Sequence, residues 1–206
     1  MNLYEKHVLP RLIDAACGMG DVMKARAKVV PQACGEVLEI GIGTGLNLQF
    51  YDPGQVASIV GVDPAGQMQK LARKRAAAIS IPVEMISVDL QGINAETARF
   101  DTIVMTFTLC SIADPVSALR EMRRVLKPSG RLLFCEHGLA PEPRVQRWQR
   151  RLTPVWKSIA GGCHLDRDVP AMLHAGGFVL GELATEYLAG PKPMTYIFSG
   201  WAVATA

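Results

Sequence analysis

The most constraining feature of the sequence is a glycine-rich turn directly after a short apolar segment. Residues 37–40 read Val-Leu-Glu-Ile, and Gly41, Gly43 and Gly45 follow them. A short apolar run that ends in clustered glycines predicts a buried strand entering a tight turn. Because Gly41 and Gly43 have no Cβ atom, the backbone there can turn sharply and approach a ligand closely.

The spacing of these glycines separates two kinds of nucleotide site. A dinucleotide fingerprint places its third glycine three positions after the second. That position is Leu46 here and the third glycine is Gly45, so the pattern is GxGxG. The loop therefore argues against a nicotinamide dinucleotide. Taken alone, it is also compatible with a tight turn that binds nothing.

Predicted strands alternate with predicted helices along the chain. After the first strand, further strands are predicted at residues 58–62, 83–88, 102–107, 131–135 and 195–203. Helices are predicted at residues 4–16, 22–30, 66–78, 115–126 and 168–175. This alternation predicts a doubly wound α/β fold, in which a mainly parallel sheet carries helices on both faces.

Three acidic residues end successive predicted strands. Glu39 lies two residues before the first glycine, while Asp63 and Asp89 follow the strands at 58–62 and 83–88. Open α/β sheets bind ligands at the carboxyl ends of their strands, so the three carboxylates are predicted to line one crevice. A carboxylate at Asp63 can accept hydrogen bonds from both hydroxyls of a ribose. Each Asp taken alone could equally be a helix N-cap or a turn residue.

Length and composition limit the classes of protein that the chain can form. Its 206 residues, of which 49% are apolar, suit one complete core, so a single domain over residues 1–206 is predicted. The 22 Lys and Arg against 19 Asp and Glu leave a net charge of +3, which favours a small ligand over nucleic acid. Five cysteines without a CxxC pair predict reduced thiols and a cytoplasmic protein. Neither a signal peptide nor an apolar stretch of bilayer length is visible.

Several segments resemble class I S-adenosylmethionine-dependent methyltransferases. They span residues 36–138 and read VLEIGIGTG, VGVDPAGQM, FDTIVMTFTLCSI and REMRRVLKPSGRLLFCEHG. The resemblance implies a Rossmann-like, seven-stranded sheet and S-adenosylmethionine as the cofactor. It also implies cofactor-binding roles for eight residues: Glu39, Gly41, Gly43, Gly45, Asp63, Asp89, Leu90 and Thr106.

The chemistry of that cofactor explains the use of acidic residues. S-adenosylmethionine carries no phosphate for a helix N-terminus to bind, and its sulfur is cationic. Glu39 is expected to face the amino group of the methionine end, near Thr106, and Asp63 to hold the ribose. Asp89 would meet the adenine amino group, with Leu90 packed on the ring.

Within this family, the sequence most resembles the methyltransferase-like group that includes alkyl-thiol methyltransferases. The similar segments are residues 108–111, 136–137, 146–156, 162–168 and 200–203. Members of that group carry an N-terminal hydrophobic anchor, which this sequence lacks, so residence at a lipid surface is not implied. Phospholipid N-methyltransferases and quinone-biosynthesis C-methyltransferases are also similar over the core.

The acceptor side offers two candidate catalytic residues, His137 and Asp166. His137 follows a predicted strand whose end should face the transferred methyl group. Its imidazole could deprotonate a thiol, whose ordinary pKa is about 8.5. The alternatives are a loop histidine bonded to backbone, and an Asp166 or Asp168 that caps the next helix. Residues 136–168 are predicted to form a substrate-side insertion, and the adjacent residues 163–166 do not predict a metal site.

Two helical segments are predicted beside the site. The N-terminal segment 1–30, which includes Tyr4 and His7, is expected to form a lid over the cofactor. Residues 144–156 place four arginines around an apolar helical face. That pattern predicts either a solvated helix that covers the active site or a peripheral contact with anionic lipid.

The sequence therefore predicts S-adenosylmethionine-dependent methyl transfer to a small hydrophobic acceptor, with a thiol favoured. The alternative acceptors are phosphatidylethanolamine, methylated on nitrogen, and a quinone precursor, methylated on carbon. From a different class, a non-enzymatic S-adenosylmethionine-binding regulatory domain is also compatible with the same motifs. Nothing in the sequence indicates the oligomeric state.

Overall fold

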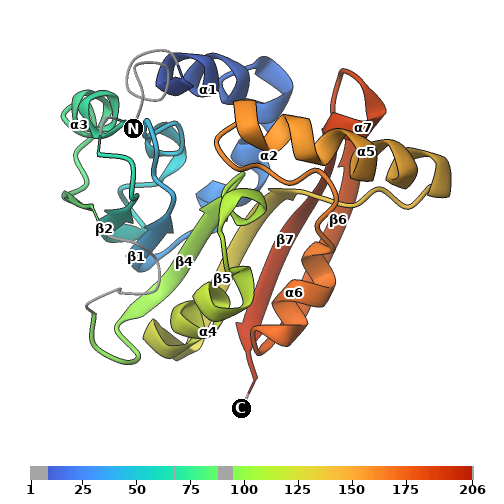
Figure 1. The fold of residues 1–206 in the computed structure, drawn as a ribbon. Coiled ribbons are helices and arrows are strands. Elements are labelled where there is room, and N and C mark those ends of the chain that lie inside the picture. Colours follow the sequence, from blue (N-terminus) through green and yellow to red (C-terminus); the bar gives the residue numbers. More distant parts are fainter. Residues whose placement is uncertain (1–8, 67, 88–94, 206) are drawn as a thin grey trace.

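The computed structural model describes residues 9–66, 68–87 and 95–205 (Figure 1). They contain one seven-stranded sheet with the strand order β3-β2-β1-β4-β5-β7-β6. The strands are β1 Gly35–Ile40, β2 Val56–Val62, β3 Val83–Ile86, β4 Phe100–Thr106, β5 Leu126–His137, β6 Phe178–Tyr187 and β7 Tyr196–Ala204. Strands β1 to β5 pair in parallel, whereas β7 runs antiparallel to both β5 and β6. The predicted seven-stranded, mainly parallel sheet is confirmed.

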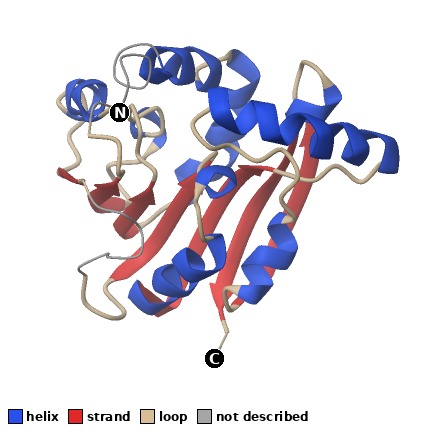
Figure 2. Ribbon diagram, in the orientation of Figure 1, coloured by secondary structure: helices blue, strands red, loops and turns tan. Residues whose placement is uncertain are grey.

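Helices cover both faces of this sheet (Figure 2). The α-helices are α1 Leu9–Cys17, α2 Gly20–Val29, α3 Gln69–Ala76, α4 Pro115–Val125, α5 Pro143–Ile159, α6 Val169–Ala175 and α7 Lys192–Thr195. Short 3-10 helices are η2 Val30–Gln32, η3 Leu48–Phe50 and η5 Leu109–Ser111. Apolar residues of α4 and α6 join one buried cluster and those of α2 join the other, so the sheet lies between two cores. This layering matches the doubly wound arrangement that the alternating pattern predicts.

The starts of two helices follow from local sequence. Asp114 accepts a hydrogen bond from the amide of Ser117 at 3.0 Å, and Asp168 accepts one from the amide of Ala171 at 3.1 Å. In α4 and α6 a proline follows near the first helical position, where a missing N–H costs nothing. Asp168, and not Asp166, therefore caps α6.

Strand β5 differs from its predicted bounds at both ends. It begins at Leu126, which pairs with Phe100, and its register with β4 shifts before residues 131–135 pair. The turn-type residues 127–130 thus form an irregularity inside the strand. At the other end β5 includes His137, and the long helix α5 lies within residues 136–168, whose role as a substrate-side insertion stays a prediction.

The helices α1 and α5 lie along the edge of the sheet where β4 and β5 end (Figure 1). The lid that residues 1–30 are expected to form stays a prediction. Helix α2 packs on a face of the sheet, where Ala25 and Val29 are buried in the core. Tyr4 and His7 lie outside the described residues. No helix among the described residues is long and apolar enough to cross a bilayer.

Candidate active site

The loop after β1 is held in a left-handed conformation and is hydrogen-bonded to the end of β2. Gly41, Gly43 and Gly45 have φ angles of +68°, +52° and +79°, which residues with a Cβ rarely adopt. The amide of Gly43 donates to Oδ2 of Asp63 at 2.9 Å. A Cβ at Gly41 would lie 2.3 Å from Oγ1 of Thr108, so this glycine also lets the loop after β4 approach. The predicted tight turn is present, and its glycines serve both conformation and packing.

Asp63 lies at the carboxyl end of β2, where its carboxylate joins two loops. Oδ1 accepts the amide of Ala65 at 2.7 Å, and Oδ2 accepts that of Gly43. Burial raises the pKa of Asp63, and the two amide hydrogen bonds oppose that rise. Each oxygen keeps a second lone pair, so the carboxylate can still accept a hydroxyl donor. The geometry suits the ribose contact that the sequence predicts, while Asp89 and Leu90 lie outside the described residues.

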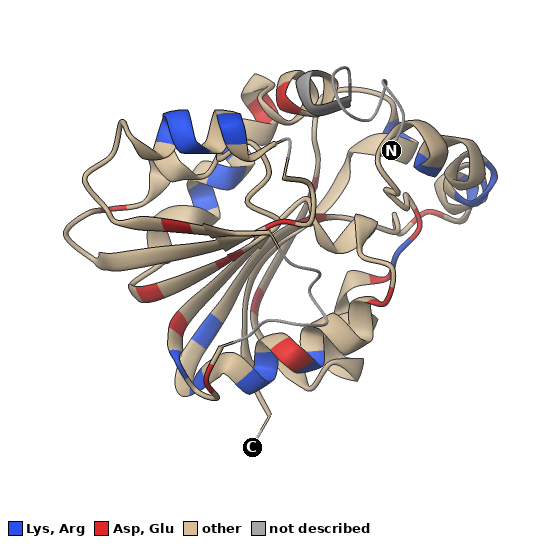
Figure 3. Cartoon of the chain, turned by 60° about the vertical axis from the view of Figure 1, so that its left-hand side comes forward, with Lys and Arg blue, Asp and Glu red and all other residues tan. Residues whose placement is uncertain are grey.

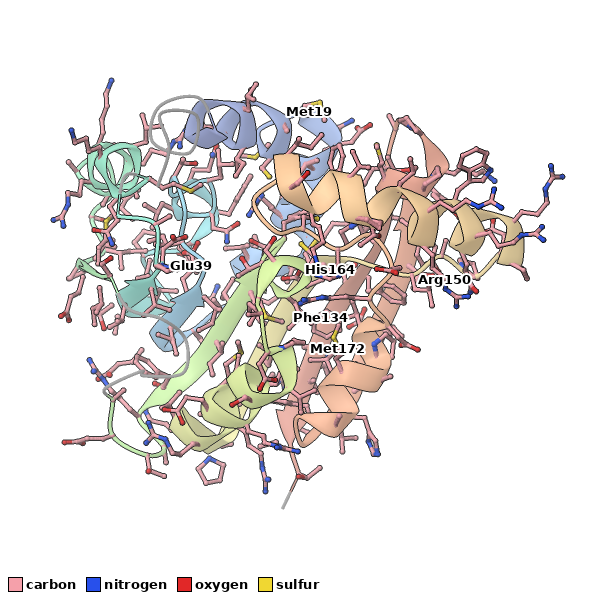
Figure 4. All side chains as sticks on the ribbon, in the orientation of Figure 1. Met19, Glu39, Phe134, Arg150, His164 and Met172 are labelled. Atoms are coloured by element: carbon pink, nitrogen blue, oxygen red, sulfur yellow. The ribbon has the colours of Figure 1, made fainter. Side chains whose placement is uncertain are left out.

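Glu39 is buried beneath the glycine loop and is only 1% exposed. Its Oε1 accepts Nδ2 of Asn47 at 3.0 Å, and its Oε2 accepts the hydroxyl of Tyr51 at 2.9 Å. Burial raises the pKa of Glu39 to about 7, against the effect of both hydrogen bonds and of the Arg26 charge. Figure 4 shows Glu39 inside the molecule, among the strands that carry the loop. The expected contact of Glu39 with the amino group of the methionine end stays a prediction. In the described structure, Asn47 links the Glu39 carboxylate to the loop after β1.

Thr106, predicted near the methionine end of the cofactor, ends β4 beside an arginine that the sequence analysis does not single out. Nη1 of Arg26 donates to Oγ1 of Thr106 at 2.5 Å and to Oδ1 of Asn47 at 2.8 Å. The guanidinium lies over the ring of Phe107, 5.0 Å from its centroid. Arg26 is 6% exposed. An arginine on the otherwise buried face of α2 is the sequence signal that could have identified it.

The order of these groups along the sheet fits S-adenosylmethionine. Because β2, β1 and β4 are neighbours, Asp63, the loop 41–45 and Thr106 follow one another at their carboxyl ends. A ligand bound along this edge would meet the Asp63 carboxylate at one end, which can accept hydrogen bonds from hydroxyl groups. At the other end it would meet the buried cation of Arg26. Nε of Arg26 is a buried donor without a hydrogen-bond partner in the described part of the chain. A nucleoside with a free ribose and a zwitterionic amino-acid end matches that order.

Glu136 is the next-to-last residue of β5, on the acceptor side, and holds the loop after β4. Both of its carboxylate oxygens lie 3.0 Å from the amide nitrogen of Thr108, and the amides of Leu109 and Cys110 also hydrogen-bond to it. Burial raises the pKa of Glu136 to about 7, and these amides oppose the rise. The residue is fully buried. Residues 136–137 belong to the segments that resemble alkyl-thiol methyltransferases. The contacts of Glu136 with the loop after β4 appear only in the folded structure.

His137, the last residue of β5, is 6% exposed. Within residues 9–66, 68–87 and 95–205 neither of its ring nitrogens is hydrogen-bonded to the backbone, so the described structure gives no support to the alternative of a backbone-bonded loop histidine. The Cys163 thiol lies within its electrostatic reach, and contacts with Cys110, His137 and Trp156 lower the pKa of that thiol. Three chain segments therefore meet at this end of β5, and each brings a nucleophilic or basic group.

The two candidate catalytic residues, His137 and Asp166, are not joined by a hydrogen bond in the described structure. Oδ1 of Asp166 accepts the hydroxyl of Thr153 at 3.2 Å and lies 3.9 Å from Nδ1 of His164. Burial lowers the pKa of His164, as do the nearby cationic side chains, so its neutral form is favoured. Asp166 thus ties α5 to the following loop, and a catalytic role for it stays a prediction. Among the described residues, no group of three or more His, Cys, Asp or Glu is arranged to hold a metal ion.

Known proteins resemble this chain in sequence and in fold. Residues 38–134 match a family model described as a methyltransferase domain. Thiol S-methyltransferase TMT1B of Rattus norvegicus is 40% identical over 137 residues, which cover 64% of this chain and 55% of that protein. The chain thus spans about half the length of this curated relative.

Solved structures show the same fold at lower sequence identity. A putative methyltransferase from Bacillus halodurans aligns with a TM-score of 0.69 and 18% identity, over 89% of this chain and 96% of that one. The methyltransferase CalH, in complex with SAH, aligns with a TM-score of 0.64 and 23% identity, over 96% of this chain and 59% of that one. Sequence and fold therefore agree that the chain carries a class I S-adenosylmethionine-dependent methyltransferase domain, with S-adenosylmethionine as its cofactor.

Proposed function

We propose that this protein transfers the methyl group of S-adenosylmethionine to the sulfur of a small hydrophobic thiol. The observation that carries the proposal is the buried imidazole of His137 at the end of β5, whose ring nitrogens have no partner among the described residues. A buried polar group without a partner is rare in folded proteins and is a candidate for a functional contact. A relative that is 40% identical over part of its length is named a thiol S-methyltransferase, which supports the choice of acceptor.

The reaction requires a close approach of two atoms, a dry environment and a place for one proton. When bound, S-adenosylmethionine would supply a methyl group on a cationic sulfur, and its transfer would form one C–S bond to the acceptor while breaking the C–S bond to the cofactor. The thiol proton passes to a ring nitrogen of His137. Because an ordinary thiol with a pKa of about 8.5 is mostly protonated at neutral pH, this base increases the reactive thiolate.

Helix α5 is fixed over this end of β5 by a buried glutamine. Nε2 of Gln149 donates to the carbonyl of Gly138 at 3.0 Å, and its Oε1 accepts the amide of Ala140 at 3.0 Å. Both bonds are buried, so they hold the helix to the backbone just beyond His137. A fixed helix here would exclude water from the acceptor and strengthen electrostatic interactions around the reacting groups.

Turnover of labelled S-adenosylmethionine against alkyl thiols, phosphatidylethanolamine, quinols and amines tests the acceptor class. We expect thiols to be methylated fastest. Methylation of phosphatidylethanolamine or a quinol without methylation of thiols would replace the proposal by the corresponding alternative. Cofactor binding without turnover of any acceptor would favour the non-enzymatic regulatory domain.

The role of His137 has its own test in the pH dependence of thiol methylation. We expect His137→Gln to lower the rate at neutral pH and to lose most of that deficit at a pH where the acceptor is already ionised. The matched control is His174→Gln, since His174 is exposed on α6. A pH profile of His137→Gln identical to that of the unaltered protein would remove His137 as the base.

A second proposal concerns α5, which we propose to rest on an anionic lipid surface. The helix contains five basic residues and no acidic one between Pro143 and Ile159 (Figure 3). Trp148, Val155 and Ile159 are 56%, 66% and 51% exposed and follow one another at intervals of seven and four residues. That spacing places them on one side of the helix. Figure 4 shows Arg150 on the same helix, at the outside of the molecule.

Basic and large apolar residues on one exposed helix are the combination that binds anionic membranes peripherally. Flotation with vesicles of phosphatidylcholine, with and without phosphatidylglycerol, tests this contact. We expect flotation only with the anionic vesicles, weakened by salt and by Trp148→Ser together with Val155→Ser. The control is Val179→Ser, since Val179 is 51% exposed on β6. Equal flotation of both variants, or none with any vesicle, would contradict the proposal.

A further inference from the structure

Arg26 is a buried cation whose charge is only partly matched by the residues that the structure describes. Nη1 makes the two hydrogen bonds to Thr106 and Asn47, both of which are uncharged. The nearest acidic group in this network is Glu39, which Asn47 separates from the guanidinium by one side chain. Burial of Glu39 also favours its protonated form, because it raises the pKa of that carboxyl to about 7. A buried charge without an adjacent counter-ion is costly unless a ligand supplies one.

The unsatisfied atom of Arg26 identifies what is missing. Nε is buried and has no hydrogen-bond partner in the described structure. An arginine guanidinium stays protonated in proteins, so Arg26 keeps its positive charge. Its N–H donors lie in one plane, which suits a carboxylate. The ring of Phe107 covers one face of that plane and helps fix its orientation. An anionic oxygen next to Nε would satisfy both the donor and the charge.

The position of Arg26 in the fold selects which anionic group this is. Asp63 at the end of β2 suits the ribose, and the glycine loop follows at the end of β1. The next strand along this edge is β4, which ends at Thr106 beside Arg26. A nucleoside whose ribose is fixed at β2 therefore extends its amino-acid end toward β4. The only anionic group of S-adenosylmethionine is the carboxylate at that end.

We infer that Arg26 binds the α-carboxylate of S-adenosylmethionine, with its Nε as a donor and Asn47 and Thr106 fixing the guanidinium. The subsite consists of one cation from α2, one amide from the loop after β1 and one hydroxyl from the end of β4. It explains why a helix that packs on the face of the sheet carries a buried arginine. It also gives the enzyme a means to distinguish the cofactor from adenosine derivatives without a carboxylate.

Calorimetric binding of two ligands without any acceptor tests this subsite. The ligands are S-adenosylmethionine and decarboxylated S-adenosylmethionine, which keeps the sulfonium and the amino group. We expect the protein to bind the first about 10- to 100-fold more tightly, as for a hydrogen bond to a charged group. In Arg26→Met this preference should vanish, while the affinity for the decarboxylated ligand stays near its original value.

The control is a second arginine that lies over an aromatic ring. It is found beside the start of β4, whereas Arg26 lies beside the end of that strand. Arg99 lies 4.8 Å from the ring centroid of Phe100, at the start of β4. Arg99→Met should leave both affinities unchanged. If Arg26→Met keeps the full preference, or weakens both ligands equally, Arg26 does not bind the carboxylate.

A measurement on the unaltered protein covers the case in which Arg26→Met fails to fold. The Nε–H resonance of Arg26 should shift when S-adenosylmethionine binds and stay in place when the decarboxylated ligand binds. Equal shifts with both ligands, or none with either, would overturn the inference. Since no acceptor is present, failure of the proposed thiol methylation would leave these results unaffected.

Discussion

Arg75 of α3 and Asp14 of α1 form a two-bond ion pair, with Nη1 2.8 Å from Oδ1 and Nη2 3.2 Å from Oδ2. The same Nη1 donates to the carbonyl of Thr44 at 2.7 Å, and the hydroxyl of Thr44 donates to Oδ1 of Asp14 at 2.5 Å. Thr44 lies in the glycine loop. The pair therefore ties α1, the proposed lid, to the segment that we expect to surround the cofactor.

We predict that Asp14→Asn speeds release of S-adenosylmethionine by about two- to tenfold, since both partners of the pair are only partly shielded from water. Stopped-flow measurement of dissociation checks this. The control is Asp21→Asn, because the exposed pair of Asp21 with Lys24 is confined to α2. Equal release rates for the Asp14 variant and the unaltered protein would show that this contact does not restrain the lid.

Asp63→Asn should weaken S-adenosylmethionine about 100-fold, because an amide can accept hydrogen bonds through only one oxygen and carries no charge. Calorimetry measures the affinity. A matched substitution is Asp101→Asn at the start of β4, where the carboxylate bonds the amide of Glu36 and the ammonium of Lys127. That variant should lose stability but not affinity. An unchanged affinity in the Asp63 variant would refute the ribose contact.

The two buried glutamates predict a stability that falls as pH rises. Burial raises the pKa of Glu39 and of Glu136 to about 7, well above the ordinary value of 4.5. The folded state thus keeps protons that the unfolded chain releases. The resulting stabilisation is complete below about pH 4.5 and is lost as pH rises through 7.

The substitution Glu39→Gln isolates the contribution of Glu39 to this pH dependence of stability. Between pH 5 and 7 the free energy of unfolding should depend on pH less steeply, by up to about 1.4 kcal/mol per pH unit, even if the variant is less stable throughout. Denaturant titrations at several pH values give the slope. Glu84→Gln, at an exposed position on β3, should leave it unchanged. Parallel curves for the Glu39 variant and the unaltered protein would contradict the raised pKa.

Cys163 should be the thiol on the acceptor side that alkylates first. The Cys110 thiol contributes most to lowering the pKa of Cys163, followed by His137. Burial, in contrast, raises the pKa of Cys135 to about 12. Iodoacetamide at pH 6.5 followed by peptide mass spectrometry should therefore modify Cys163 well before Cys135. Cys110→Ala should slow the modification of Cys163, and an unaltered rate would mean that the two thiols do not interact.

More of the fold than of the candidate site could be predicted from the sequence. The strands are local apolar runs bounded by turn residues, so the alternating pattern and the GxGxG turn are readable one segment at a time. The register shift in β5 was missed because residues 127–130 have the local composition of a turn, whereas pairing with β4 keeps them in the strand.

The site depends on contacts between distant segments. Arg26 and Thr106 are 80 positions apart, and Glu136 bonds an amide 28 positions away. Strand ends could predict Asp63 because parallel strands bring their carboxyl ends together. No local pattern could show that Glu39 is enclosed by Asn47 and Tyr51, since that depends on how the loop after β1 closes.

Strand β7 follows β6 in the chain but lies between β6 and β5 in the sheet. During synthesis on the ribosome, β6 emerges before the strand that is to separate it from β5. Until then it has no neighbour in the sheet, and both of its edges can pair with other strands. The antiparallel pair β6–β7 thus joins the parallel strands as a late-arriving hairpin. Nascent chains in which β6 has left the ribosome but β7 has not would consequently carry an unshielded strand, and those are the chains that a chaperone would need to protect.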